Sequence, residues 1–291
     1  MLPLVMLLVL LAAVTVAWLL AREPGEGVAT AAAIIADIRS EGLGAYWSGE
    51  PVLHWYLIRI RGKPVGWRVT YRQGDDDGFG GGQVLIRRSP KGGATEAISS
   101  WWLNRDATRG VYKGHSLGSS VVAQDSGRLV KMRSETEARI ELRDGQLNIL
   151  QVFDGRPVES QAPAPPGYIP EGADDLAMAL AAQRRTHALF RMIIDQYPPE
   201  GSYPIFLRLS MQYLGPPEGE PNHTVMEVTR SRRGQTLNKA TYILDRDGEV
   251  LESSYEIGGR SFTETRSSEE NVLKVFPNAR SIFTSLTHYD D

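Results

Sequence analysis

The sequence has 291 residues, of which 42% are hydrophobic and 23% charged, and its formal net charge at pH 7 is -3. This is the composition of a globular protein of one or two domains, and without a basic block that carries interleaved aromatic residues we expect no nucleic-acid partner. The sequence contains no cysteine, which excludes disulfides, thiolate metal ligands, a cysteine nucleophile and a lipid-modified cysteine.

The first 21 residues carry no charge. About 20 apolar residues in a helix span a bilayer core, and Trp18 lies where indole rings favour the membrane interface. A cleaved signal peptide would need a basic start and a small-residue cleavage site, and both are missing. We therefore expect residues 1–24 to be an uncleaved membrane anchor, in which residues 1–21 lie in the membrane. A cleaved signal and a buried core helix are the alternatives.

The anchor predicts a single-pass protein whose body lies outside the cytoplasm, on the periplasmic or cell-surface side. Behind the anchor, apolar residues spaced three and four apart predict a short helix within residues 25–44. These residues are Ala31, Ile34, Ile35 and Ile38. We interpret this helix as a stalk or as the first helix of the body.

Beyond Trp47 the apolar period changes to two, which is typical of β-strands. Residues 54–73 alternate around a turn at Gly62, Lys63 and Pro64, and this pattern predicts a hairpin. Asp144 and Gly145 mark a second hairpin turn. We therefore assign residues 45–165 to a first β-rich unit.

A proline-rich linker and one long helix are predicted over residues 166–199. The helix begins near Asp174 and Asp175, because acidic residues suit a helix N-terminus, and extends to about residue 196. Strand patterns then return, and residues 200–291 are assigned to a second β-rich unit with a C-terminal tail. The predicted fold class is mainly β (α+β): two antiparallel β-units, curved like open barrels, with one long helix between them.

Two stretches resemble a known class of protein. Residues 55–67, WYLIRIRGKPVGW, look like the opening strand pair of a β-rich region that precedes a transglutaminase-like domain in certain bacterial exported proteins. Residues 245–259 and 264–273 are similar to the segment just ahead of that domain. The transglutaminase-like domain uses a cysteine, and this sequence has none. The resemblance therefore implies an accessory module without the catalytic domain.

Residues 114–118 match G-x-S-x-G, the nucleophile elbow of α/β-hydrolases, with Ser116 at its centre. That elbow needs an apolar strand before the serine and a helix after it. Lys113 precedes the motif, and the β-branched pair Val121 and Val122 follows it, so the surroundings favour a strand. We interpret Ser116 as an ordinary strand or loop serine and assign no catalytic residue.

Two further groups of residues are candidates for binding. Asp75, Asp76 and Asp77 could supply oxygen ligands to Ca²⁺, but they lack the spacing of a calcium loop, so we expect a solvated hairpin tip and no metal. Four aromatic residues are candidates for the lining of an apolar ligand site: Trp67, Trp101, Trp102 and Phe190. No cofactor is indicated.

The function that the sequence favours is a non-catalytic, membrane-anchored interaction or scaffold module of a bacterial envelope, which would bind an envelope protein. A carrier of an apolar ligand such as a lipid is the alternative, because curved antiparallel sheets can enclose such ligands. A serine hydrolase that uses Ser116 is the second alternative.

Overall fold

The computed structural model describes residues 25–88, 94–121, 129–153, 155–193 and 206–287. The expected membrane anchor lies outside these residues. Among the helices that are described, none is both long enough and apolar enough to span a bilayer.

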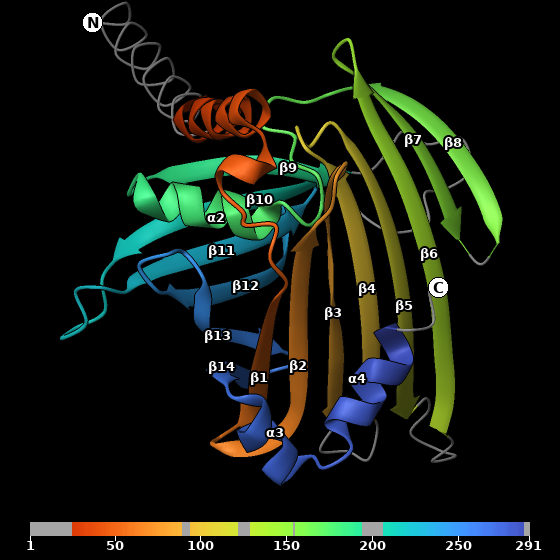
Figure 1. Ribbon diagram of the computed structural model, residues 1–291, viewed down its shortest axis with the longest axis vertical. Helices are drawn as coiled ribbons and strands as arrows, with labels where there is room; N and C mark the ends of the chain where they lie inside the picture. Colours follow the sequence, from red (N-terminus) through yellow and green to blue (C-terminus); the bar gives the residue numbers. More distant parts are fainter. Residues whose placement is uncertain (1–24, 89–93, 122–128, 154, 194–205, 288–291) are drawn as a thin grey trace, which may run out of the picture.

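Fourteen strands form one antiparallel sheet within the described residues (Figure 1). The first half contains β1 (Val52–Ile60), β2 (Lys63–Gly74), β3 (Gly78–Arg88), β4 (Ala94–Asn104), β5 (Arg109–Val121), β6 (Leu129–Arg143), β7 (Gln146–Phe153) and β8 (Arg156–Pro163). The second half contains β9 (His187–Ile193), β10 (Phe206–Gly215), β11 (Thr224–Arg232), β12 (Gln235–Leu244), β13 (Val250–Ile257) and β14 (Arg260–Ser267).

The two halves join where the first strand meets the last. β1 pairs with β14, with Leu57 opposite Thr265, so the strand order runs without a break from β8 through β1 and β14 to β9. The two separate β-units expected from the sequence are therefore the two halves of one sheet. β8 and β9 form its edges, and Tyr168 adds an isolated parallel bridge to Arg191 of β9.

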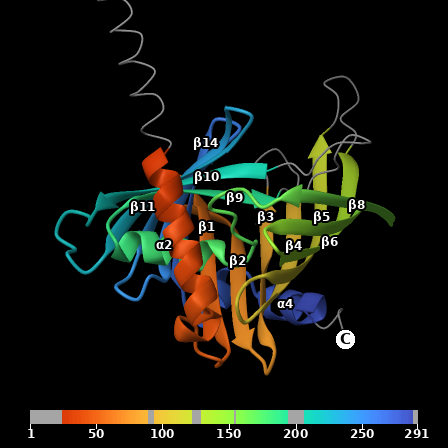
Figure 2. The same ribbon diagram turned by 90° about the horizontal axis from the view of Figure 1, so that it is seen from above.

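The helix over residues 25–41 is part of the body and not a free stalk. Its residues Ala31, Ile34 and Ile38 are at most 1% exposed and belong to the main hydrophobic core. The helix lies across one end of the molecule, next to α2 (Figures 1 and 2). Gly42, with φ of 77°, ends it in the left-handed region that glycine adopts readily.

The long central helix predicted from the sequence is shorter in the structure. α2 covers Asp174–Gln183, and the chain then leaves helical geometry at Arg185, which has φ of 52°. Residues His187–Ile193 form β9 and pair with β10, so the prediction of helix over these residues is wrong. Pairing with the edge of an existing sheet satisfies the backbone there, and this tertiary context overrides the local helical pattern.

A second, smaller core lies on the other face of the sheet. It contains Trp55, Leu57, Trp67, Val69 and Val84 of β1, β2 and β3. Two helices that the sequence prediction had treated as a tail cover it: α3 (Glu269–Val275) and α4 (Ala279–Thr287). The side chain of Ser268 caps α3 by accepting a hydrogen bond from the amide of Asn271 at 3.2 Å.

Candidate functional site

The inner face of the sheet and the start of α2 enclose a central cavity of about 620 Å³. Its wall carries four arginines from the strands, which are Arg68, Arg72, Arg87 and Arg230. It also carries five carboxylates: Glu171, Asp174, Asp175, Glu249 and Glu264. A charged wall of this kind is unusual inside a β-sheet protein, where apolar side chains ordinarily fill the interior.

Three of the four arginines are neutralised by ion pairs within the wall. The distances are 2.7 Å between Arg68 Nε and Glu264 Oε2, 3.2 Å between Arg72 Nη2 and Glu249 Oε1, and 3.6 Å between Arg230 Nη2 and Asp174 Oδ2. Each pair joins elements that are far apart in the sequence. The pairs therefore hold the wall together as well as balancing its charge.

The pair of Arg68 and Glu264 is the most enclosed of the three, with 18% and 6% of the two side chains exposed. The hydroxyl of Tyr255 donates a hydrogen bond of 2.6 Å to the other oxygen of Glu264. Burial and the Glu264 carboxylate raise the pKa of Tyr255, so its phenol remains a neutral donor. The guanidinium of Arg68 also lies 4.4 Å from the ring centre of Tyr56.

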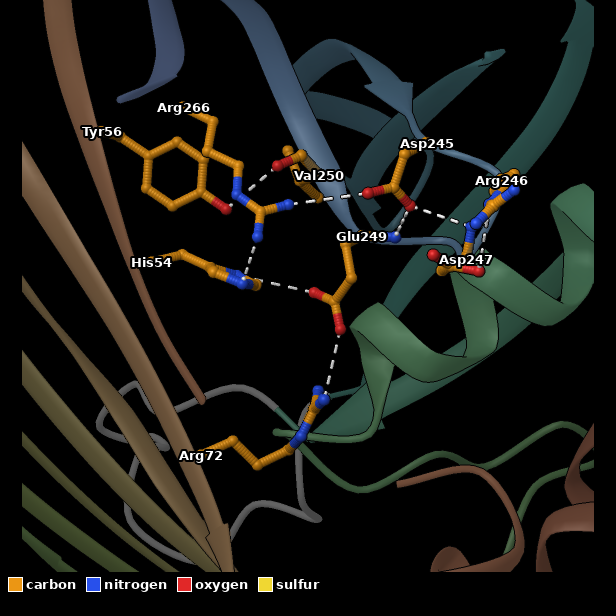
Figure 3. Close-up of polar contacts among 9 residues, drawn as sticks. All are labelled: His54, Tyr56, Arg72, Asp245, Arg246, Asp247, Glu249, Val250 and Arg266. Carbon is orange, nitrogen blue, oxygen red and sulfur yellow. Dashed lines mark hydrogen bonds and ion pairs between the residues drawn. The ribbon is translucent and has the colours of Figure 1, made fainter. Parts of the chain in front are cut away.

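A second polar network lies around His54 (Figure 3). Arg266 Nη2 lies 2.6 Å from His54 Nε2, and His54 Nδ1 lies 3.6 Å from Glu249 Oε2. Because a guanidinium can only donate, Nε2 is the acceptor and the imidazole is neutral with its proton on Nδ1. Burial and the charge of Arg266 lower the pKa of His54, while Glu249 acts in the opposite direction.

This network connects the first strand to the turn between β12 and β13. Arg266 Nη1 lies 3.6 Å from Asp245 Oδ2, and Tyr56 donates a hydrogen bond of 3.2 Å to the carbonyl of Val250. The turn itself packs against α2, because a Cβ added to Gly248 would lie only 2.5 Å from Ala179 Cβ. The polar network therefore fixes α2 relative to the strands that bear the cavity wall.

Two charges of the wall have no ion pair among the described residues. Asp175 lies beside Asp174 at the start of α2, and its accessible surface faces the cavity. Burial and the neighbouring Asp174 raise the pKa of Asp175 to about 6. The guanidinium of Arg87 lies 4.7 Å from the ring centre of Phe262.

The cavity has an apolar rim where it meets solvent. Leu237 near the start of β12 and Ile257 at the end of β13 both line the cavity, and they are 52% and 45% exposed. Arg87 lies at the same end of the sheet. The wall therefore combines charged groups and buried apolar side chains such as Met192 in the interior, and it has two exposed aliphatic side chains at the opening.

A wider groove of about 840 Å³ lies on the surface of β5 to β8. Its charged side chains pair with one another across neighbouring positions, as in Arg109 with Glu141 and Arg139 with Glu137, at solvent-exposed sites. The central cavity is the better candidate site, because most of its charged side chains are partly or fully buried and three of its arginines are held by ion pairs.

The four aromatic residues expected to line a ligand site do not lie together. Trp101 lines the cavity, with its ring packed against Trp47 at 5.7 Å between centres. Trp67 faces the opposite side and is buried under α3 and α4, and Phe190 is fully buried in the main core. The indole of Trp102 donates a hydrogen bond of 3.1 Å to Asp75 Oδ2.

The acidic stretch of Asp75, Asp76 and Asp77 lies in the turn between β2 and β3. Asp75 Oδ1 accepts hydrogen bonds from the amides of Asp77 and Gly78 at 2.8 and 2.6 Å, so this carboxylate stabilises the turn. In the part of the chain that the structure describes, no cluster of three or more acidic, histidine or cysteine side chains is arranged to hold a metal ion.

Ser116 lies within β5, with Ala97 of β4 on one side and Ser134 of β6 on the other. The chain is extended on both sides of it, so the strand-to-helix turn of a nucleophile elbow does not occur at this serine. Its neighbour His115 has Nδ1 3.4 Å from an oxygen of Glu135.

The cavity charges are the residues that sequence reasoning missed. Arg68 and Arg72 alternate with Trp67, Val69 and Tyr71 along β2, and this alternation shows that the two faces of the strand differ. It does not show which face is inside, because large side chains occupy both faces.

Comparison with known proteins adds information about the fold alone. No protein family and no curated protein matches the chain. Among solved structures, the chain is similar to one described as a β-barrel-like protein of the domain of unknown function DUF1849 from Brucella abortus. The TM-score is 0.52 at 11% identity, and the match covers 75% of this chain and 95% of the other. The mainly β, barrel-like architecture is therefore shared with a protein of unknown function.

Proposed function

We propose that this protein is a non-catalytic binding protein that holds a ligand in its central cavity. The observation that carries the proposal is a cavity of about 620 Å³ with nine charged residues on its wall. This volume is within the range of ligand sites in proteins. Charged groups in the interior are costly unless they meet partners, water or a bound molecule, and a wall that served only stability would be apolar.

The chemistry of the wall favours a ligand that carries polar or charged groups. Arginines, carboxylates and tyrosines face the cavity among buried apolar residues such as Met192 and Leu207, and the exposed aliphatic residues Leu237 and Ile257 lie at the rim. A wholly apolar ligand would leave these polar groups without water or hydrogen-bond partners. The carrier that we propose therefore takes the polar part of its ligand inward.

An interaction module of a bacterial envelope is the second candidate. The edge strand β8 favours it, because among the described strands β8 pairs with β7 alone and could pair with a strand of an envelope protein. Both candidates place the body outside the cytoplasm, as residues 1–21 predict, and neither requires catalysis by Ser116.

Ligand binding can be tested by filling the cavity. Ser253 lines the cavity and is 3% exposed, while its neighbour Ser254 points to the other face of β13 and is exposed. The full chain would be purified in lipid nanodiscs as wild type, as Ser253→Phe and as the matched control Ser254→Phe. Bound small molecules would then be released and compared by mass spectrometry.

We expect a compound that is present with wild type and with Ser254→Phe but is lost with Ser253→Phe. Thermal unfolding of each variant would show that the fold is intact. Identical extracts from all three proteins, together with no binding of added cationic, anionic or neutral amphiphiles, would overturn the proposal.

A further inference from the structure

We propose that the cavity binds a ligand through a positively charged group, a protonated amine or a guanidinium, which pairs with Asp175. This inference rests on the proposed function and names the class of ligand. It follows from three features of the cavity: its balance of charge, the position of Asp175 and the apolar rim.

The balance of charge favours a cation, although arginines are the most conspicuous residues of the wall. The wall has five carboxylates and four guanidiniums, and the neutral imidazole of His54 adds no charge. Three of the guanidiniums are already paired with Glu264, Glu249 and Asp174. At these three arginines an anionic ligand would have to compete with the internal carboxylates, and Arg87 at the rim is the remaining guanidinium. A cation would meet a surplus of negative charge in the interior.

Asp175 is the carboxylate of the wall for which no hydrogen bond or ion pair occurs among the described residues, and its side chain faces the cavity. The charged groups around it come from every neighbouring element: Asp174 from α2, Arg68 from β2, Arg230 from β11 and Glu249 from the turn before β13. Tyr56 and Tyr242 also lie near it. The nearby arginines are engaged elsewhere, so an incoming cation would supply the partner that Asp175 lacks.

The pKa of Asp175, raised to about 6 by burial and by Asp174, agrees with this geometry. The Asp175 side chain keeps part of its surface open to the cavity, so a cationic ligand can reach it. A ligand that displaces the cavity water would strengthen the pairing, because water would then screen the interaction less. Tyrosine rings on the wall provide further favourable surface for a cation.

The rim indicates how the ligand lies. Leu237 and Ile257 present exposed aliphatic surface at the opening, where apolar groups of a ligand can be buried. The ligand that fits both ends carries its cation inward to Asp175 and an aliphatic part outward to the rim. Arg87 at the rim would repel a cation placed there, and this also favours the inward orientation.

The test uses three probes that differ only in their polar end: n-hexylamine, sodium n-hexanoate and n-hexanol. Each would be titrated by calorimetry into the full chain in nanodiscs, with empty nanodiscs as the reference. The variants are Asp175→Asn, which keeps the shape of the side chain, and Asp175→Glu, which keeps its charge. Glu252→Gln on the other face of β13 is the matched control, because it removes the same charge outside the cavity.

We expect hexylamine to bind more tightly than the other two probes and Asp175→Asn to weaken it by about 10-fold or more, as the loss of a charge-assisted hydrogen bond requires. Glu252→Gln should leave the affinity within about 2-fold. The wild-type affinity should rise between pH 5 and 7 as Asp175 loses its proton, and this rise should be absent from Asp175→Asn.

Equal hexylamine affinity for wild type and Asp175→Asn would overturn the inference, as would tighter binding of hexanoate. If hexanol or hexanoate binds at least as tightly as hexylamine and Ser253→Phe abolishes that binding, the proposed function stands and the inference about the cation fails. If none of the probes binds better than to empty nanodiscs, the inference fails. The proposed function fails with it if the extracts of wild type, Ser253→Phe and Ser254→Phe are also identical.

Discussion

The two faces of β1 and β2 differ in a way that reverses the usual arrangement of a curved sheet. On the outer face Trp55, Leu57, Trp67 and Val69 form an apolar core beneath α3 and α4. On the inner face of the same two strands are side chains with polar groups, which are His54, Tyr56, Arg68 and Arg72. These two strands are therefore stabilised by apolar packing on their outer face. Their inner face can then carry charged side chains that packing alone would not favour.

Removal of the more buried of the two outer tryptophans should have the largest effect on stability. Trp67 is 1% exposed, and its ring lies 5.8 Å from that of Trp55. We expect Trp67→Ala to lower the free energy of unfolding by about 3–5 kcal/mol, because it leaves a large cavity in the core. Urea unfolding measures this loss, with Trp102→Ala at a half-exposed position as the control. Hexylamine binding by the folded fraction should stay unchanged, and a change there would show that the two faces are coupled.

Glu264 tests the inner face. Its removal in Glu264→Ala leaves the guanidinium of Arg68 in the interior without its 2.7 Å partner. We expect the free energy of unfolding to fall by about 3 kcal/mol, because an interior charge without a partner destabilises the folded state. The double variant Arg68→Ala, Glu264→Ala should recover part of this loss in a double-mutant cycle. Additive effects of the two changes would contradict a direct interaction between these side chains.

Glu249 tests the junction of the two halves of the sheet. Glu249→Gln weakens the contacts of this side chain with Arg72 and His54 at 3.2 and 3.6 Å. We expect the free energy of unfolding, measured with a chemical denaturant at pH 7, to fall by about 1–2 kcal/mol. The effect is limited to this size because the carboxylate is only partly enclosed. Glu141→Gln at the exposed pair with Arg109 is the control and should lower the free energy of unfolding by less than about 0.5 kcal/mol. Equal losses of unfolding free energy in the two variants would show that the inner network contributes no more to stability than an exposed ion pair does.

His54 gives the same junction a dependence on pH. Its pKa is lowered in the folded protein, so the unfolded chain takes up a proton first as the pH falls below about 6.5. Its contribution to stability is therefore present above that pH and is lost as the pH falls towards the folded pKa. In His54→Gln this part of the pH dependence should disappear.

The smallest of these expected effects is an increase in stability. The pKa of Asp175 is raised to about 6 from a usual value of 3.8, so above pH 6 the folded state holds a charge that the unfolded state accommodates more easily. We expect Asp175→Asn to raise the free energy of unfolding by about 1 kcal/mol at pH 7. This is less than the whole pKa shift would give, because water in the cavity screens the charge. The gain should vanish below about pH 4, where the carboxyl is protonated in both states. Thermal unfolding at the two pH values measures it, and a loss of stability at pH 7 would contradict this reading.

The sequence predicted the hairpins well, because alternation and turn residues act locally. The hairpin expected over residues 54–73 corresponds to β1 and β2, and the turn at Asp144 and Gly145 joins β6 to β7. The antiparallel, mainly β character of the fold followed from these signals. The pairing of β1 with β14 carries no local signal, so one continuous sheet was predicted as two units.

The helices show where local patterns fail. Apolar residues after Gln183 continue a helical spacing, but they belong to β9 because the sheet edge is available there. α3 has a local signal in the sequence, since Ser268 followed by Glu269 and Glu270 is typical of a helix start. Of the candidate ligand residues, Trp101 lines the cavity, whereas Trp67 lies on the opposite face of the sheet. The sequence could not distinguish the two, because strand alternation does not show which face is the inner one. The resemblance to a transglutaminase-associated region stays a prediction.

The pairing of the first strand with the last also sets the order in which the chain can fold during synthesis. His54 and Arg266, which meet across β1 and β14, are 212 residues apart. At usual rates of translation, β1 therefore waits about 10–40 s for its partner, with one edge open to pairing with other chains. Contacts this distant in sequence also slow folding. A chaperone that shields β1 during this interval would act on the step that closes the cavity.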